Sequence, residues 1–285
     1  MSEGPTLDAL LPADMAVKAE AIGVKKAGLD APAMFMLAVL AGAFISMGAV
    51  FSTTVTAGAG IPFGLSRLLG GVVFSLGLIL VVVGGAELFT GNNLIVMAWA
   101  GKKVRTSQLL RNWLIVYLGN FAGSIATAAL VFLAGHYNLG GGAVGAKALA
   151  IADAKCGLDF APAVFLGVLC NALVCLAVWL SFSARSAADK VLVIVPPIAA
   201  FVAAGFEHSI ANMYFIPVGL FIKQFAPAEF WVQAGVSADA YSNLSWLGFG
   251  RNLLPVTIGN ILGGAVLVGI VYWFIYLRPR KKAEA

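Results

Sequence analysis

The stretch "GFEHSIANM" at residues 205–213 places two adjacent ionisable residues, Glu207 and His208, inside an otherwise apolar segment. The run "VLVIVPPIAAFVAA" precedes it and "YFIPVGLFI" follows it. Ionisable side chains are costly at membrane depth, and those that occur there mark ion or substrate pathways. A second stretch, "GAELFTGN" at residues 85–92, shares with it the pattern G-x-E-x-x-x-x-N. The fold must therefore hold two related polar stretches within apolar surroundings.

The composition predicts an all-α membrane protein. Of the 285 residues, 61% are hydrophobic and 11% are charged, and the mean hydropathy is +0.95. A soluble domain cannot bury that much apolar surface, so the composition excludes a one-domain soluble enzyme. The net charge of +5 is concentrated near the expected membrane ends and indicates topology rather than nucleic-acid binding.

Six apolar segments predict six transmembrane helices: 33–56, 68–98, 108–134, 161–182, 190–224 and 252–277. A helix needs about 20 residues to cross the hydrocarbon layer, so the second and fifth segments are too long for single spans. Each of these two contains one of the polar stretches. We therefore expect spans 2 and 5 to be broken into half-helices, with each break surrounded by protein or by a watery cavity.

The two halves of the chain resemble each other. The motif R-N-x-L-x-V-x-x-G-N-x-x-G occurs at residues 111–123 and again at residues 251–263. Each half contains three expected spans, and an odd number makes the second half enter the membrane from the opposite side. The sequence thus predicts a 3+3 inverted repeat, in which sites lie where the paired broken helices meet.

Four residues occupy matching positions in the two breaks: Glu87 with Glu207, and Asn92 with Asn212. Because a helix break leaves backbone N–H groups without partners, we expect these residues to form a scaffold, although conducting carboxylates are the alternative. His208 matches Leu88, so the imidazole belongs to one side only and indicates a pathway residue. Thr90 either caps the half-helix after its break or hydrogen-bonds the permeant.

The distribution of cations predicts the orientation. Thirteen Lys and Arg residues lie on the side that holds both termini and five lie on the other side. The positive-inside rule therefore places both termini in the cytoplasm. The longer loops, 135–160 and 225–250, are then external.

Three regions are expected. Residues 1–32 form a cytoplasmic N-terminal region in which Thr6 to Lys26 reads as an amphipathic helix, lying on the membrane face or over the mouth of the protein. Residues 33–277 form the six-span transport domain, and residues 278–285 form a cytoplasmic tail.

No cofactor or metal is expected. The three cysteines, Cys156, Cys170 and Cys175, show neither metal-ligand spacing nor a disulfide framework. No nucleophile triad or phosphate loop is visible. A membrane-embedded enzyme subunit is disfavoured because only two histidines are present. A neutral-solute channel for water or glycerol is disfavoured because paired Asn-Pro-Ala breaks are absent.

The stretches "GAELFTGN", "GFEHSIANM" and "VTIGNILGG" closely resemble the formate/nitrite transporter family. The opening "LDALLPADMAVKAEAIGVKKA" resembles its formate-channel branch, and the resemblance extends over residues 7–277. It implies an aquaporin-like protomer and a homopentamer with one pore per protomer. It also implies passage of small monovalent anions, or their conjugate acids, through the lipid bilayer of the bacterial inner membrane.

The resemblance also implies residue roles. It predicts an outer and an inner constriction, formed by Phe74 with Phe201 and by Leu78 with Leu88 and Val174. Asn171 would lie along the pathway, and Lys155 would draw anions into the outer vestibule. Thr90 matches the family's Ω loop.

The substrate expected first is formate, passed by a pH-dependent channel or transporter. "GAELFTG" is closer to the pattern of nitrite members, so nitrite, or another small anion such as hydrosulfide, is the alternative. A bare anion loses much hydration between apolar rings. Either His208 transfers a proton to it, or His208 stabilises it by hydrogen bonding without transfer, and both mechanisms remain open.

Overall fold

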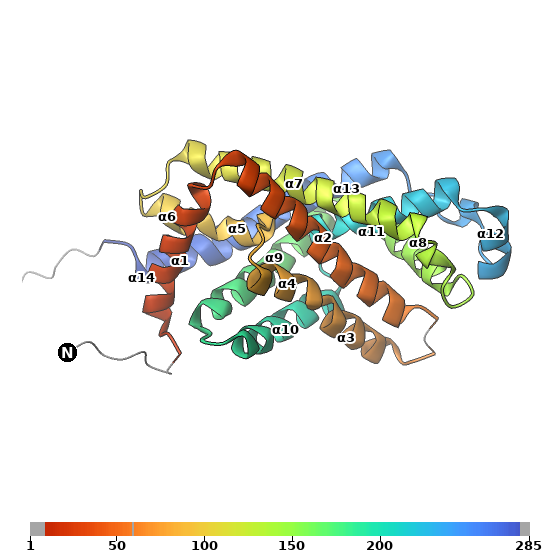
Figure 1. The fold of residues 1–285 in the computed structure, drawn as a ribbon, viewed down its shortest axis with the longest axis horizontal. Coiled ribbons are helices and arrows are strands. Elements are labelled where there is room, and N and C mark those ends of the chain that lie inside the picture. The colour runs from red at the N-terminus through yellow and green to blue at the C-terminus, as the bar shows by residue number, and fades with distance from the viewer. Residues whose placement is uncertain (1–8, 59, 280–285) are drawn as a thin grey trace, which may run out of the picture.

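The computed structural model describes residues 9–58 and 60–279, and its regular elements are helices throughout that part of the chain (Figure 1). Six of the described helices are long and apolar enough to cross a membrane: Ala31–Thr56, Phe63–Gly84, Thr106–Leu133, Phe160–Ser183, Ala187–Ala204 and Trp246–Tyr276. This number confirms the prediction of several membrane-spanning helices. The expected start of the first helix at Thr6 and most of the expected tail lie outside the described residues.

The first helix, α1 (Pro12–Ala27), begins at Pro12 rather than at the expected Thr6, and residues 9–11 are not helical. Proline suits the first helical turn, since its missing N–H would have no partner there. The buried face of α1 packs against protein, and Gly23 lies against Ile95 and Ala98.

The chain through the first polar stretch forms a series of short helices: α3 (Phe63–Phe74), α4 (Leu76–Gly84), α5 (Phe89–Asn92), η1 (Asn93–Ile95) and α6 (Val96–Ala100). Helical structure stops after Gly84 and resumes at Phe89. Gly85 has φ 82°, a left-handed conformation that a residue with a Cβ rarely adopts, and it ends α4.

The second polar stretch separates α10 (Ala187–Ala204) from α11 (Ser209–Phe225). Gly205 has φ 79° and ends α10 in the same way. Before the two breaks, Phe63–Gly84 has 22 residues and Ala187–Ala204 has 18, so each is long enough to cross a membrane.

Two long helix pairs form the body of the protein: α2 (Ala31–Thr56) with α7 (Thr106–Leu133), and α9 (Phe160–Ser183) with α13 (Trp246–Ile261). A Cβ on Gly123 would lie 2.0 Å from the Val39 carbonyl oxygen, and one on Gly263 would lie 2.1 Å from that of Val168. The small residues of both repeated motifs therefore allow close backbone crossing. The chain continues through η4 (Leu262–Ile270), a π-helical segment, and α14 (Val271–Tyr276).

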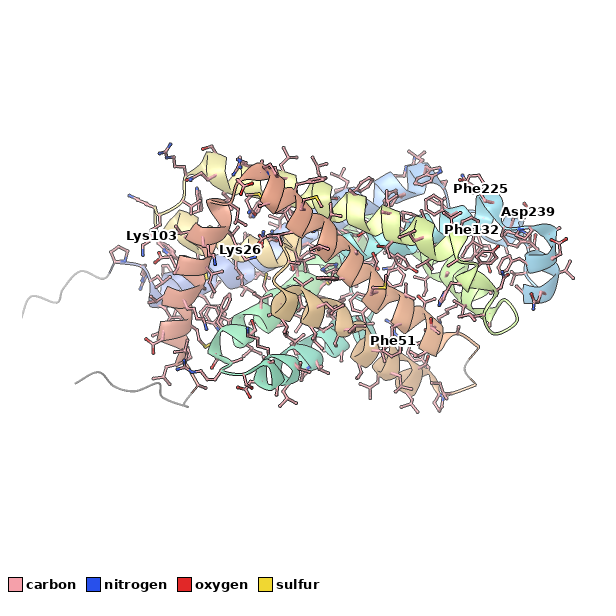
Figure 2. All side chains as sticks on the ribbon, viewed as in Figure 1. Lys26, Phe51, Lys103, Phe132, Phe225 and Asp239 are labelled. Carbon is pink, nitrogen blue, oxygen red and sulfur yellow. The ribbon has the colours of Figure 1, made fainter. Side chains whose placement is uncertain are left out.

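The two ends of the molecule carry different elements. Helices α1 and α14 lie at one end, while α8 (Ala143–Cys156) and α12 (Ala228–Ala234) lie at the other (Figure 1). Figure 2 shows Lys26 at the α1 end and Phe225 and Asp239 at the α12 end. Two short 3-10 segments, η2 (His136–Asn138) and η3 (Ala238–Ala240), complete the described elements. Helix α8 corrects the expectation that residues 135–160 form a loop.

Candidate permeation pathway

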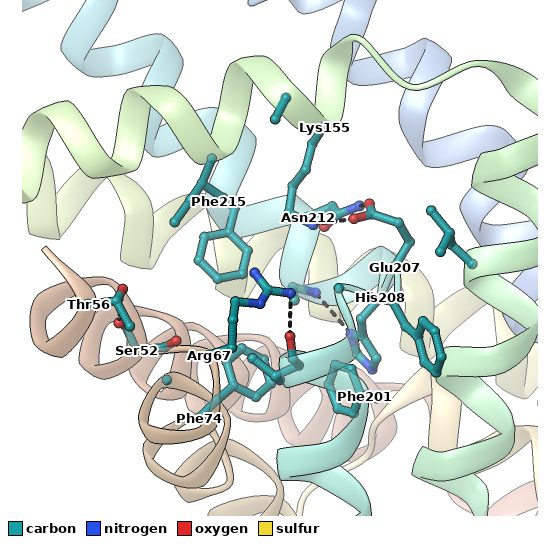
Figure 3. A pocket seen from close by; sticks show the side chains of 18 of the residues that line it. Ser52, Thr56, Arg67, Phe74, Lys155, Phe201, Glu207, His208, Asn212 and Phe215 are labelled. Carbon is teal, nitrogen blue, oxygen red and sulfur yellow. Dashed lines mark hydrogen bonds and ion pairs between the residues drawn. The ribbon is translucent and has the colours of Figure 1, made fainter. Parts of the chain in front are cut away.

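The helix bundle contains two cavities, one lined in part by residues of α8 and the other in part by residues of α1. The Lys155 cavity has a volume of about 330 Å³, and its lining includes Lys155, Glu207, His208, Phe74 and Phe201 (Figure 3). The Lys26 cavity has a volume of about 490 Å³, and its lining includes Lys26, Glu87, Asn92, Leu78 and Leu88. Each cavity thus combines a lysine, a glutamate and an asparagine with apolar side chains.

The residues expected at the constrictions are all buried and belong to one apolar cluster: Phe74, Phe201, Leu78, Leu88 and Val174. The rings of Phe74 and Phe201 meet edge to face with centroids 5.7 Å apart. Val174 lines neither cavity, and it is buried within the same cluster.

Thr90 and His208 are in direct contact although 118 residues separate them in the chain. The Oγ1 atom of Thr90 lies 3.0 Å from Nε2 of His208, and both side chains are buried. The other ring nitrogen, Nδ1, accepts the backbone N–H of Ala211 at 3.1 Å. A neutral imidazole has one donor and one acceptor nitrogen, so the proton lies on Nε2 and points toward Thr90.

This contact gives His208 two roles. As the residue that precedes α11, it caps that helix through Nδ1, as a capping side chain does. Through Nε2 it presents an N–H group beside the hydroxyl of Thr90. The two hydrogen-bonding groups that the sequence placed in separate breaks thus form one pair.

The first break is held by a compact set of polar side chains. The carboxylate of Glu87 accepts a hydrogen bond from Lys26 Nζ at 2.7 Å and another from Asn92 Nδ2 at 2.7 Å. Lys26 also donates to Asn92 Oδ1 at 3.0 Å. Asn112 accepts from Asn92 at 3.0 Å and donates to the carbonyl oxygen of Lys26 at 3.2 Å. The buried carboxylate is therefore fully paired, as a buried charge requires.

The second break has a closely similar set. Lys155 Nζ and Asn212 Nδ2 each donate to the carboxylate of Glu207 at 2.7 Å. Asn252 accepts from Asn212 at 2.7 Å and donates to the carbonyl oxygen of Lys155 at 2.9 Å. Corresponding residues thus make corresponding contacts in the two halves with one exception: Lys26 donates to Asn92 Oδ1, whereas the buried Oδ1 of Asn212 has no hydrogen-bond partner among the described residues.

The backbone of each break is held by one asparagine. Asn120 donates to the carbonyl oxygens of Glu87 and Ala38 at 2.9 and 2.7 Å, and its own oxygen accepts the N–H of Phe89 at 2.9 Å. Asn260 makes the matching contacts in the second break. These amides accept the N–H groups of Phe89 and Ser209, while the glutamate carboxylates bind lysine and asparagine side chains rather than backbone N–H groups.

Asn171 lies beside the pair rather than on a cavity wall. It is fully buried and lines neither cavity. Its Nδ2 atom donates to the carbonyl oxygen of Thr90 at 3.3 Å, to Asn93 Oδ1 at 2.8 Å and to the carbonyl oxygen of Asn260 at 2.7 Å. Its contacts position the backbone that carries the Thr90 hydroxyl.

Sequence reasoning missed Lys26, Asn112 and Asn252. The pattern K-x-G-L-D occurs at residues 26–30 and again at residues 155–159, directly before α2 and α9, and would have identified Lys26. Both asparagines stand in the R-N dipeptide that opens the repeated motif. Their role depends on contacts with other helices, which the motif alone does not reveal.

The three cysteines are free, and no group of three or more His, Cys, Asp or Glu residues within the described part of the chain could hold a metal ion.

Known proteins resemble this chain over most of its length. The family model described as Formate/nitrite transporter matches residues 13–274. The formate channel FocA of Escherichia coli (strain K12) is 51% identical over 273 residues, which cover 95% of this chain and 96% of the relative. The FocA of Haemophilus influenzae (strain ATCC 51907 / DSM 11121 / KW20 / Rd) is 44% identical over 264 residues, covering 92% and 93%.

A solved structure described as a pentameric formate channel with formate bound is also similar. It is 48% identical, superposes with a TM-score of 0.83, and the match covers 87% of this chain and 98% of that one. The family model spans most of the chain and both relatives match nearly end to end, so this chain belongs to the formate/nitrite transporter family.

Proposed function

We propose that this protein is a formate channel with a pH-dependent flux. The observation that carries the proposal is the buried Thr90–His208 pair, which offers a hydroxyl and an N–H group where apolar rings separate two lysine-bearing cavities. The names of the similar proteins point to the same substrate.

The pair explains how an anion can pass an apolar barrier. Formate that leaves the Lys155 cavity loses water between the rings of Phe74 and Phe201. The hydroxyl of Thr90 and the Nε2–H of His208 replace part of that lost hydration. The anion then reaches the Lys26 cavity past Leu78 and Leu88.

Two mechanisms differ in what happens to the proton. In one, His208 only donates a hydrogen bond and the anion crosses as an ion. In the other, an imidazolium gives its proton to formate and the neutral acid crosses. In the neutral ring, Nδ1 carries no proton and accepts the N–H of Ala211. His208 must therefore acquire a second proton before it can transfer one to formate. Acidic conditions on the donor side therefore favour the second mechanism.

We further propose that the fold is a 3+3 inverted repeat with spans 2 and 5 broken within the membrane. The matched contact sets of the two breaks support this arrangement, as do the matching glycine crossings of α7 on α2 and of α13 on α9. The K-x-G-L-D pattern indicates that each repeat begins with a short helix, α1 in one half and α8 in the other.

The location follows from the charge pattern and from the relatives. The excess of Lys and Arg at the α1 end favours a cytoplasmic position for both termini. The two sequence relatives are bacterial, which supports the inner membrane. The similar solved structure is described as pentameric, which supports a homopentamer. Native mass spectrometry in mild detergent tests the assembly, and a stable monomer or tetramer contradicts it.

Nitrite is the second candidate substrate. "GAELFTG" around the first break favours it, and nitrite resembles formate in size, planarity and charge.

Flux into proteoliposomes tests the proposal. Purified protein is reconstituted, and uptake of formate, nitrite, lactate and chloride is followed at several external pH values, with empty liposomes as the control. We expect saturable formate uptake that increases at acidic external pH. Formate uptake equal to that of empty liposomes contradicts the proposal. Proteoliposome swelling that is faster in glycerol than in formate also contradicts it.

A further inference from the structure

Arg67 lies in the Lys155 cavity, close to the apolar constriction. It comes from α3 and lines the cavity together with Phe74, Phe201 and His208. Figure 3 shows its guanidinium group on the same side of the cavity as His208, while Lys155 enters from α8. No motif in the sequence drew attention to this residue.

The position of the guanidinium group is fixed by the end of α10. Nε donates to the carbonyl oxygen of Ala203 at 2.9 Å, and Nη2 donates to that of Val202 at 2.7 Å. The N–H of Gly205 also donates to the carbonyl oxygen of Val202, at 3.1 Å, so Arg67 adds to the cap at the end of α10. Of the five guanidinium N–H groups, the other three have no partner among the described residues.

The charge of Arg67 is uncompensated, unlike that of Lys155. The ammonium group of Lys155 is 2.7 Å from the carboxylate of Glu207, so these two charges largely cancel. Among the described residues, Arg67 hydrogen-bonds to two carbonyl oxygens and forms no ion pair. Lys147 also lines the cavity without a recorded ion pair, but no hydrogen bond within the described part of the chain fixes its position. Arg67 thus combines net charge with a defined position.

The other break does not use such a residue. Val82 and Val83 correspond to Val202 and Ala203, and among the described residues no side chain donates to their carbonyl oxygens. A break can therefore end its first helix without an arginine. This difference indicates that Arg67 serves the cavity as well as the helix end.

We propose that Arg67 docks the substrate anion beside the Phe74–Phe201 constriction. Two of its N–H groups hold the end of α10, and the remaining ones bind a planar anion with two oxygens, as the guanidinium fork binds a carboxylate. The anion then waits next to His208 before it loses its hydration. This inference rests on the proposed function and adds the residue that loads the pathway from the Lys155 side.

Initial rates of formate and nitrite uptake into proteoliposomes test the docking role, with KM and maximal rate determined at low and high ionic strength. Arg67→Gln removes the charge, and Arg67→Lys keeps the charge but loses the two-point cap on α10. Arg251→Gln is the control, because Arg251 is exposed and lies outside the cavity. Gel filtration confirms the assembly of each variant.

We expect Arg67→Gln to raise KM about three- to tenfold, and Arg67→Lys, which keeps the charge but loses the guanidinium fork, to raise KM by less than Arg67→Gln does. Added salt should raise the KM of wild type more than that of Arg67→Gln, since salt screens the attraction. The control should change KM by less than twofold.

Four results contradict the inference or the proposed function on which it rests. If Arg67→Lys and Arg67→Gln reduce the maximal rate alike with KM unchanged, Arg67 only caps α10. The docking inference is also wrong if Arg67→Gln fails to assemble and Arg67→Lys keeps a wild-type KM that no longer responds to salt. Wild-type protein that transports neither anion overturns the proposed function itself, whereas normal wild-type flux with an unchanged KM in Arg67→Gln overturns the docking role alone.

Discussion

Replacing Asn260 by alanine should destabilise the protein strongly, because this side chain joins three backbone groups around the second break. It donates to the carbonyl oxygens of Gly167 and Glu207 and accepts the N–H of Ser209, each at 2.9 Å. Asn260 is fully buried, so water cannot replace these bonds.

The magnitude follows from the number of bonds. Hydrogen bonds between membrane helices average about 0.6 kcal/mol each, and a buried group left unpaired in a protein costs about 1 kcal/mol or more. Three bonds therefore give roughly 2–3 kcal/mol, which corresponds to a fall of roughly 4–12 °C in Tm for a chain of this size. Asn260→Asp keeps the acceptor oxygen but loses both donor bonds. If the new carboxylate is charged, Asn260→Asp should lower Tm more than Asn260→Ala does.

The assay is thermal unfolding in detergent, followed by tryptophan fluorescence, with Ser46→Ala as the control. Ser46 is also fully buried, but its hydroxyl only donates to the carbonyl oxygen of Gly42 in its own helix. We expect the control to lower Tm by no more than about 2 °C. An Asn260→Ala protein with the Tm of the control would refute the idea that this amide holds the break.

Two further predictions concern other parts of the pathway. Thr90→Ala should reduce formate flux at least about tenfold while Thr90→Ser retains it, because only the hydroxyl faces His208; normal flux in Thr90→Ala would leave Thr90 as a helix cap. Deleting residues 1–26 removes the lysine that pairs with Glu87, and it should change formate flux or its pH dependence while the assembly stays intact. Unchanged flux at every pH would exclude a role for α1 in regulating the flux.

Much of the fold could be predicted because it depends on local patterns. Apolar runs located the six long helices, and the glycines that end α4 and α10 lie in the predicted polar stretches. The amphipathic pattern indicated α1, although Pro12 sets its start. Helix α8 was missed because residues 135–160 are too polar for a span and contain consecutive glycines.

The site was predicted less completely because its contacts join distant segments. Thr90 and His208 were each identified from a polar residue at a break, and the structure brings them together. Lys26 was missed because its partner Glu87 is 61 residues away on another element. Arg67 was missed for the same reason, since the carbonyl oxygen of Val202 that it caps is 135 residues away.

We propose that the Thr90–His208 pair carries formate across the apolar barrier and that His208 supplies the link to the proton. The most direct test uses His208→Asn, because the asparagine oxygen can still cap α11 and its amide can still donate a hydrogen bond, but no transferable proton remains. His208→Phe, which keeps neither property, is the companion variant.

Formate flux and internal pH are recorded together in proteoliposomes between about pH 5 and pH 8, the range in which an unperturbed imidazole titrates. The account predicts that in wild type the number of protons carried with each formate falls as the pH rises. His208→Asn should conduct formate with a proton number that does not change with pH, and His208→Phe should conduct far less. If wild type and His208→Asn show the same flux and the same proton number across this range, His208 is a structural cap and the account is wrong.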